Sequence, residues 1–272
     1  NRPSPNLRGE ERLGMQPPVD KISERQLHKR ARDRPEYETD SSQRTATEGK
    51  SFANANSNVA EVVVVAPPGQ PTLKAAYFFS GKSRKSSVGE ELRKLTIEKG
   101  VGLIVYEVDI LNGGGEHDLL DKAAQYSWEA RVRDGEFDIL FLTPPCASWS
   151  RSLCRPGGPC PVRDRSSPWG FPHALEKVRK RARLGNEFIH FTIRMGQAAK
   201  AARPGVVTRW LLEHPEDLGK TPNGGDPASI WQLPDIHDLV DEEAGFKTVA
   251  GHQCQFLVDY SKPTRLASDV PL

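Results

Sequence analysis

The chain has little cysteine, little methionine and no long apolar run. Only 4 of its 272 residues are Cys and 2 are Met. No two cysteines form a C-x-x-C pair, so Cys154 and Cys160 give little support to a zinc site or a disulfide framework. No apolar stretch approaches the ~20 residues that span a bilayer, and no apolar signal segment opens the chain. We therefore expect free thiols, no metal, and a soluble intracellular protein.

The chain also lacks an excess of either charge. It has 38 Lys and Arg against 36 Asp and Glu, which gives a net charge of +2. This balance neither requires nor excludes nucleic acid as a partner, and it says nothing of oligomeric state. Because the chain begins at Asn1 rather than Met, we expect a fragment or a processed piece of a longer protein.

Residues 1–70 differ in composition from the rest. They mix charged residues with Ser, Asn and Pro and contain few large apolar side chains, so they cannot bury enough surface to offset the entropy of ordering. We predict a disordered polar tail or linker over 1–70 and a folded domain over 71–272. The apolar run at 61–66 is either an edge strand of that domain or an apolar segment of the linker, and the sequence leaves both open.

From residue 73 onward, apolar runs of strand length alternate with stretches typical of helices. This alternation predicts an α/β domain of the Rossmann-like type, a three-layer sandwich with a mostly parallel sheet. A break near Gly185-Asn186 is allowed in the long helix over 175–202. The predicted strands are 74–79, 101–108, 137–142, 206–212, 246–258 and 264–267, and the predicted helices are 88–99, 116–133, 175–202 and a stretch within 228–244.

The third predicted strand, 137–142, runs into Thr143-Pro144-Pro145-Cys146. Proline fixes φ and removes a backbone donor, so two prolines end the strand on a stiff segment. The residue that follows lies at the carboxyl end of a strand, where open α/β sheets bind their ligands. That residue is Cys146, whose thiolate is a strong nucleophile. The pattern predicts a catalytic thiol.

Two other strand ends, and the turn Gly113-Gly114-Gly115 beyond the second of them, carry candidate binding residues. Gly81 follows the first strand, where it either admits a ligand close to the backbone or merely forms a turn. Asp109 follows the second strand and suits a ribose hydroxyl pair, with Glu107 as the second choice. The His117-Asp118 pair either lines an adenine pocket or caps a helix, and capping is the commoner role.

The fourth strand, 206–212, runs into Glu213-His214-Pro215. Because parallel strands end at one edge of the sheet, this carboxylate can face Cys146. A buried Glu can hold a proton and donate it to a ring nitrogen. The alternative is an ordinary ion pair at the strand end.

In this order, these elements resemble the DNA (cytosine-5)-methyltransferase family, closest to the reduced domains of transposon-derived polyproteins. The similarity covers about residues 74 to 268. The resemblance implies S-adenosylmethionine as the cofactor, Cys146 as the nucleophile at cytosine C6 and Glu213 as the group at N3. It also implies cofactor contacts from Phe79, Ser80, Gly81, Glu107, Asp109, Asp118 and Pro144.

The partner implied by the resemblance is DNA, with RNA as the second choice, inside the nucleus. A flipped-out cytosine is the expected substrate. Basic residues after the nucleophile and near the last strand are expected to contact phosphates. They are Arg151, Arg155, Arg163, Arg165 and Arg265.

Two other functions stay open. The domain is alternatively a catalytically degenerate module that binds nucleic acid within a mobile-element polyprotein. Three departures favour this: Lys82–Ser87 replace the family's second cofactor-loop glycine, His214 replaces an Asn, and Arg265 matches the Gln-x-Arg-x-Arg element only loosely. The last alternative is a cysteine hydrolase with His117 or His252 as its base, although no orienting group is adjacent to either.

Overall fold

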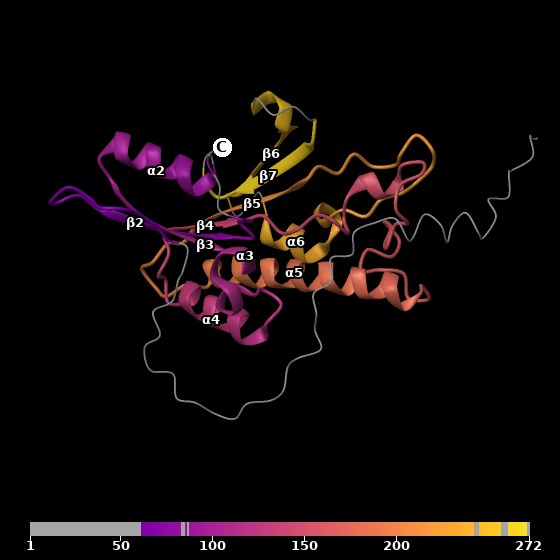
Figure 1. Cartoon of the computed structure of the whole chain (residues 1–272), viewed down its shortest axis with the longest axis horizontal. Helices are drawn as coiled ribbons and strands as arrows, with labels where there is room; N and C mark the ends of the chain where they lie inside the picture. Colours follow the sequence, from indigo (N-terminus) through magenta and orange to yellow (C-terminus); the bar gives the residue numbers. More distant parts are fainter. Residues whose placement is uncertain (1–60, 83–84, 86, 242–244, 257–260, 271–272) are drawn as a thin grey trace, which may run out of the picture. The chain divides into compact units, whose positions relative to one another are not determined.

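The computed structural model describes residues 61–270, apart from 83–84, 86, 242–244 and 257–260. This part forms a seven-stranded sheet in the order β1-β3-β2-β4-β5-β7-β6 (Figure 1). Neighbouring strands among β3, β2, β4 and β5 are parallel, whereas β1, β7 and β6 pair antiparallel. The strands are β1 (Glu61–Val64), β2 (Thr72–Phe78), β3 (Gly102–Val108), β4 (Ile139–Leu142), β5 (Arg209–Pro215), β6 (Lys247–His252) and β7 (Pro263–Ser268).

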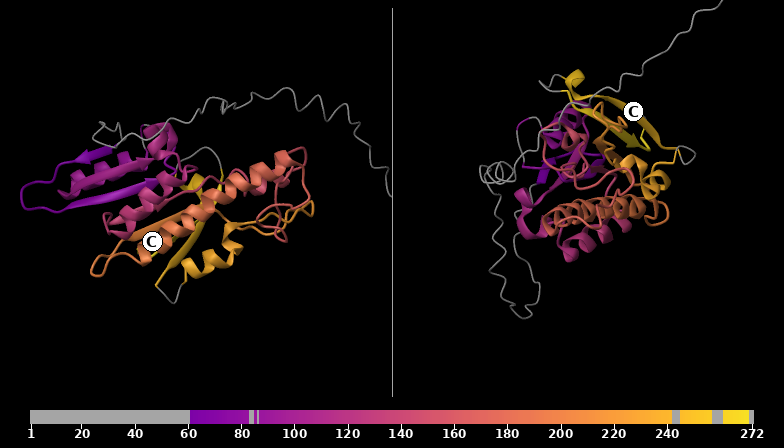
Figure 2. Two further views of the ribbon diagram at one scale, coloured as in Figure 1. Left: turned by 90° about the horizontal axis from the view of Figure 1, so that it is seen from below. Right: turned by 90° about the vertical axis from the view of Figure 1, so that its right-hand side faces the viewer.

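Helices cover both faces of the sheet. In Figures 1 and 2, α4, α5 and α6 lie along one face and α2 lies on the other. The larger core, which includes Phe78, Trp128, Phe191 and Leu212, lies on the face of α4, α5 and α6. This arrangement confirms the predicted α/β, Rossmann-like sandwich. The helices are α2 (Val88–Lys99), α3 (Ile110–Gly113), α4 (Lys122–Arg133), α5 (Glu176–Lys200) and α6 (Pro234–Leu239), with the 3₁₀ turns η1 (Gly114–His117), η2 (Arg151–Cys154), η3 (Ile230–Gln232) and η4 (Gln253–Phe256).

The boundaries of α2 match the prediction because its caps are encoded locally. Ser87 accepts a hydrogen bond from the Glu90 amide, and Gly100 ends the helix at φ +67°. The predicted helix over 116–133 was too long, since α4 begins only at Lys122, where Asp121 caps it. The predicted strand over 246–258 was also too long, since β6 ends at His252.

The predicted break in the long helix was wrong, because α5 continues unbroken through Gly185 and Asn186. A Cβ atom on Gly185 would lie only 2.0 Å from Ser148 Oγ, so this glycine allows the loop after Cys146 to pack directly on the helix. Asn186 Nδ2 donates to the Trp169 carbonyl at 2.8 Å. Both residues therefore serve packing rather than a kink.

The apolar segment at 61–66, whose role the sequence left open, contains the first strand of the sheet. Residues Glu61–Val64 pair antiparallel with β3, so this segment is an edge strand of the sheet. Residues 1–60 of the predicted tail lie outside the described residues. Among the described residues, no helix is both long enough and apolar enough to cross a membrane.

Candidate functional site

The carboxyl ends of β2 and β4 form the topological switch point of the sheet. From β2 the chain first adds β3 on one side and later adds β4 on the other side. Strands β2 and β4 are parallel neighbours, while β3 and β5 lie to either side of them. Ligands of open α/β sheets bind outside such a point. Thr143 Oγ1 donates to the carbonyls of Phe78 and Phe79, at 3.3 Å each, so the loops after β2 and β4 meet there.

Cys146 lies on a fixed turn at this edge. Pro144 is buried, Pro145 is exposed and the free thiol of Cys146 is half-buried. The Trp149 amide donates to the Cys146 carbonyl at 2.9 Å and closes the turn. The indole of Trp149 is buried, so it anchors the turn in the core. The two prolines predicted a restrained turn at Cys146, and the buried Trp149 side chain is a second restraint on that turn.

Arg163 holds the same turn from beneath. Its side chain is buried, and its guanidinium lies 3.8 Å from the centre of the Trp149 ring. Burial lowers the pKa of Arg163 to about 10, which leaves it charged at neutral pH. The guanidinium donates hydrogen bonds to the Ser148 carbonyl, Ser148 Oγ, the Pro168 carbonyl, Asn186 Oδ1 and the Ala182 carbonyl. This placement does not fit the predicted contact between Arg163 and phosphate, because the buried guanidinium donates its hydrogen bonds to protein acceptors in and around the loop.

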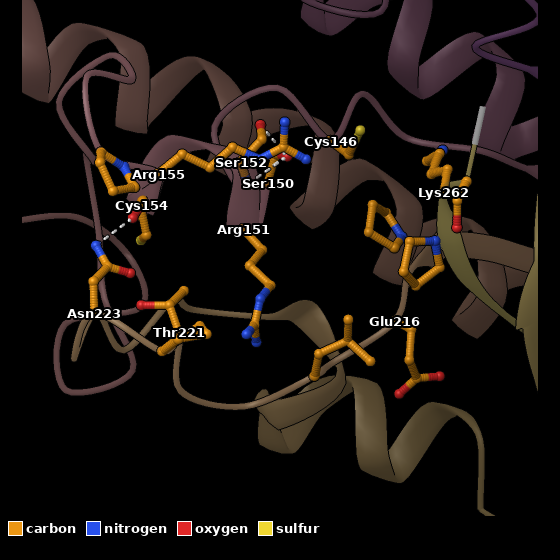
Figure 3. A pocket seen from close by; sticks show the side chains of 16 residues that line it. Cys146, Ser150, Arg151, Ser152, Cys154, Arg155, Glu216, Thr221, Asn223 and Lys262 are labelled. Carbon is orange, nitrogen blue, oxygen red and sulfur yellow. Dashed lines mark hydrogen bonds between the residues drawn. The ribbon is translucent and has the colours of Figure 1, made fainter.

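A cavity of about 690 Å³ opens beside Cys146 (Figure 3). Its walls come from the turn after β4, from η2, from the loop after β5 and from the residues just before β7. Polar groups from three of these segments reach it, including Arg151, Glu216 and Lys262. A volume of this size suits a base or a nucleoside.

Glu213 contacts Lys262, which lines the cavity as Cys146 does, whereas Glu213 is not among the described residues that line it. Glu213 lies on β5 one residue past Leu212, which pairs with Leu142 at the end of β4. Its Oε1 accepts a hydrogen bond from Lys262 Nζ at 3.1 Å, and this is the strand-end ion pair that the sequence left open as the alternative role of Glu213. Since Lys262 also lines the cavity with Cys146, a thiol, an ammonium group and a carboxylate gather at this edge.

Sequence reasoning missed Lys262. It belongs to a loop whose lysine has no distinctive neighbours, so no local signal identifies it. Only the antiparallel pairing of β5 with β7 brings it to Glu213: Pro215 pairs with Thr264, two residues after Lys262.

His214, next to Glu213, points to the opposite face of the sheet. It is fully buried, and burial together with the nearby charge of Lys262 lowers its pKa to about 3. The imidazole is therefore neutral at physiological pH. It supports the strand from within the core and does not enter the cavity.

On the other side of Cys146, the loop after β2 is held by the end of β3. Gly81 has φ +69°, and its amide donates to Asp109 Oδ2 at 3.0 Å. Asn112 Nδ2 donates to the Gly81 carbonyl at 2.8 Å and to Ser80 Oγ at 3.1 Å. Asn112 was not predicted from the sequence. No described residue comes within 4 Å of a Cβ built on Gly81, so the positive φ is the feature of this position that favours glycine.

The two acidic candidates on this side differ in what they bind. The oxygens of Asp109 accept from Gly81 and from the Leu111 amide, so this carboxylate stabilises the loop and α3. Glu107 is buried; its Oε1 accepts from Ser87 Oγ at 3.0 Å, while Oε2 has no hydrogen-bond partner among the described residues. Glu107, the second choice from the sequence, therefore has the free acceptor.

Phe79 and Asp118 complete the predicted cofactor residues on these loops. Phe79 has φ +62°, alone among the described non-glycine residues, and such strain gathers at functional sites. Asp118 Oδ1 accepts from the Leu120 amide, which makes a turn ahead of α4. The helix cap is the next acidic residue, Asp121, so Asp118 itself does not cap α4.

Most of the predicted phosphate-binding arginines are engaged within the protein. Arg165 pairs with Asp217 and Asp226, both at 3.1 Å. Arg265 binds Glu216 through two hydrogen bonds of 2.9 and 2.8 Å. Arg151 donates to two backbone carbonyls, at positions 219 and 220. Arg155 is exposed at the mouth of the cavity.

No protein-family model matches the sequence, and no curated protein matches it significantly. Among solved structures, the crystal structure of the S. pombe Dnmt2 methyltransferase is similar, with 11% identity and a TM-score of 0.33. The match covers 72% of this chain and 49% of that one, so it spans about half of that methyltransferase. A likeness of this degree carries no argument about activity or substrate.

Proposed function

We propose that this domain is an S-adenosylmethionine-dependent methyltransferase that acts on cytosine C5 in DNA through a cysteine adduct. The observation that carries the proposal is the cavity of about 690 Å³ on which Cys146 and Lys262 meet, with Glu213 bound to Lys262. A nucleophile and a cation on the wall of a space of nucleoside size, with a carboxylate bound to that cation, suit addition to a pyrimidine ring.

Cys146 is the nucleophile of the proposal. Its sulfur adds to C6, which consumes the C5–C6 double bond and moves electron density to C5. Glu213 takes up a proton and donates it in a hydrogen bond to N3, which is an acceptor in cytosine, so the charge that develops on the ring is stabilised. Its ion pair with Lys262 opens for this step. Once C5 carries a methyl group, transfer of the C5 proton to a base such as water and cleavage of the C6–S bond restore the ring and the thiolate. Before substrate binds, Lys262 holds the carboxylate of Glu213.

The residues at the β2 and β3 ends fit the proposed cofactor. S-adenosylmethionine supplies an electrophilic methyl group when bound. Oε2 of Glu107 has no hydrogen-bond partner among the described residues and can accept one from a ribose hydroxyl, although the atom is buried and the loop after β2 has to move to expose it. At Gly81 no described atom lies within 4 Å of a built Cβ, which allows a close approach to the backbone. Thr143 ties these loops to the segment that carries Cys146, so both halves of the site share one edge.

Methyl transfer to cytosine-containing duplex DNA tests the proposal. We expect 5-methylcytosine in the digested product by mass spectrometry, none with Cys146→Ala, and undiminished yield with Cys154→Ala. Cys154 is a matched control because it lines the same cavity while burial raises the pKa of its thiol. Loss of transfer in both variants, or in neither, would contradict the role of Cys146.

A second candidate function is nucleic-acid binding without catalysis. The observation that favours it is the internal bonding of the cofactor loops, where Gly81, Asp109 and Asn112 satisfy one another. Calorimetry separates the two candidates: an absence of S-adenosylmethionine binding at millimolar concentration, alongside DNA binding, would favour the non-catalytic module.

A further inference from the structure

The N-terminal half of α5 extends past the ends of the strands (Figures 1 and 2). On its inner side, Ala182 and Gly185 are buried against the loop that follows Cys146. Arg163 joins the two parts, since it donates to the Ala182 carbonyl at 2.9 Å and also to Ser148 in the turn. The projecting half of α5 and the Cys146 turn are thus parts of one packed unit.

The outer side of this half is strongly basic. Glu176 is the only acidic residue among positions 176–183, and all five basic side chains there are exposed. Arg179 and Arg183 both pair with Glu176. The other three, Lys177, Lys180 and Arg181, make no ion pair or hydrogen bond with any described residue.

These three residues form one stripe along the helix. Their spacing is i, i+3, i+4, which places them on a single face. The stripe is about 6 Å long between the first and the last Cα along the axis, at 1.5 Å per residue. We refer to Lys177, Lys180 and Arg181 as the basic stripe.

Stability of the helix does not account for the basic stripe. Cations in the first turns of a helix oppose its dipole, and like charges at i and i+4, such as Lys177 and Arg181, repel each other. Both effects destabilise the isolated helix. A bound anion at this surface would neutralise these charges and turn both destabilising effects into stabilising ones.

We propose that the basic stripe binds the phosphate backbone of nucleic acid outside the cavity. The choice of nucleic acid as the partner rests on the proposed function. Binding of phosphates by the basic stripe does not, however, require that the domain transfers methyl groups. Four of the five arginines expected to bind phosphate are engaged within the protein, which leaves the stripe as an exposed, unpaired alternative. Its attachment to the Cys146 turn through Arg163 would hold a bound strand in a fixed relation to the thiol.

Fluorescence anisotropy with a random-sequence DNA duplex across a salt series tests the stripe. The variant K177Q/K180Q/R181Q is expected to bind about tenfold more weakly or worse at low salt, and to reduce the slope of log K against log salt by about 3. The matched control R179Q/R183Q, which removes the paired arginines, is expected to change the slope by less than about 1. Thermal unfolding of the triple variant should occur at an equal or higher temperature, because repulsion is relieved.

An unchanged slope in the triple variant would overturn the proposal, as would equal losses in both variants. Stronger stripe-dependent binding to vesicles of phosphatidylserine than to DNA would overturn the choice of partner.

The outcomes also separate the proposal for the basic stripe from the proposed function. A wild-type protein that binds DNA through the stripe but transfers no methyl group would contradict the proposed function alone, whereas transfer by a triple variant with wild-type DNA affinity would contradict the stripe alone.

Discussion

The two sides of the carboxyl edge are built differently. The thiol side comprises Cys146, Glu213 and Lys262: Cys146 and Lys262 line a cavity of about 690 Å³, and Glu213 is bound to Lys262. Buried Arg163 donates hydrogen bonds to the loop after Cys146. The cofactor side (Gly81, Glu107, Asp109 and Asn112) is closed by hydrogen bonds among its own groups. The thiol side thus offers a space for a ligand, while on the cofactor side the buried Oε2 of Glu107 has no hydrogen-bond partner among the described residues. Substitutions on each side test whether the two sides differ in this way.

The largest effect is expected at Arg163. Arg163→Met leaves several buried carbonyls without a donor, so the free energy of unfolding should fall by about 3–5 kcal/mol in urea titrations. Arg165→Met is the matched control, since this side chain is 39% exposed and its ion pairs contribute about 1 kcal/mol or less. Equal decreases in the free energy of unfolding of the two variants would show that the buried hydrogen bonds of Arg163 do not stabilise the loop after Cys146.

Acid should destabilise the thiol side through His214. Its folded pKa is about 3 against an ordinary 6.5, so the unfolded chain binds more protons between these values. Stability is present in full above pH 6.5 and falls as the pH drops toward 3. His214→Gln should remove about a few kcal/mol of that dependence in denaturation at several pH values. The exposed His173→Gln should leave the curve unchanged; an equal change in both would contradict the assignment.

Gly185→Ala tests the packing of α5 on the Cys146 loop. The added methyl group meets Ser148 Oγ, so we expect a loss of about 1–3 kcal/mol in thermal unfolding and reduced methyl transfer. Gly115→Ala is the control, because nothing lies within 4 Å of a Cβ at that position. A harmless Gly185→Ala would mean that the loop can shift away from the helix at little cost.

The smallest effect is expected on the cofactor side. Asn112→Ala removes two hydrogen bonds to the loop after β2 and should cost about 1 kcal/mol. Its larger consequence should be a severalfold weaker affinity for S-adenosylmethionine by calorimetry. Asn223→Ala removes a hydrogen bond to Cys154 on the thiol side and should leave that affinity unchanged. A reversed pattern would assign the cofactor to the other side of the edge.

Local signals predicted the helices and strands whose ends are encoded nearby. Ser87 and Gly100 set the ends of α2, and the prolines after β4 set the turn at Cys146. Contacts between distant segments could not be predicted in this way. Lys262 reaches Glu213 only through the pairing of β5 with β7, and Arg163 was taken as a surface group because its burial depends on α5 packing above it.

The choice between Asp109 and Glu107 shows the same limit. Proximity to the strand end favoured Asp109, but the loop after β2 uses that carboxylate for its own amide at Gly81. Which oxygen remains free depends on a hydrogen bond that spans 28 residues of sequence. Sequence spacing alone does not contain that information.

The most direct test of the central claim, that Cys146 and a bound methyl donor share one site, is trapping with a 5-fluorocytosine DNA duplex. Fluorine replaces the C5 proton that must leave, so an adduct formed after methyl transfer cannot break down. We predict a denaturant-stable protein–DNA species that forms only with S-adenosylmethionine and maps to Cys146 by mass spectrometry. The absence of an adduct, an adduct at Cys154, or one that forms equally without S-adenosylmethionine would contradict the account.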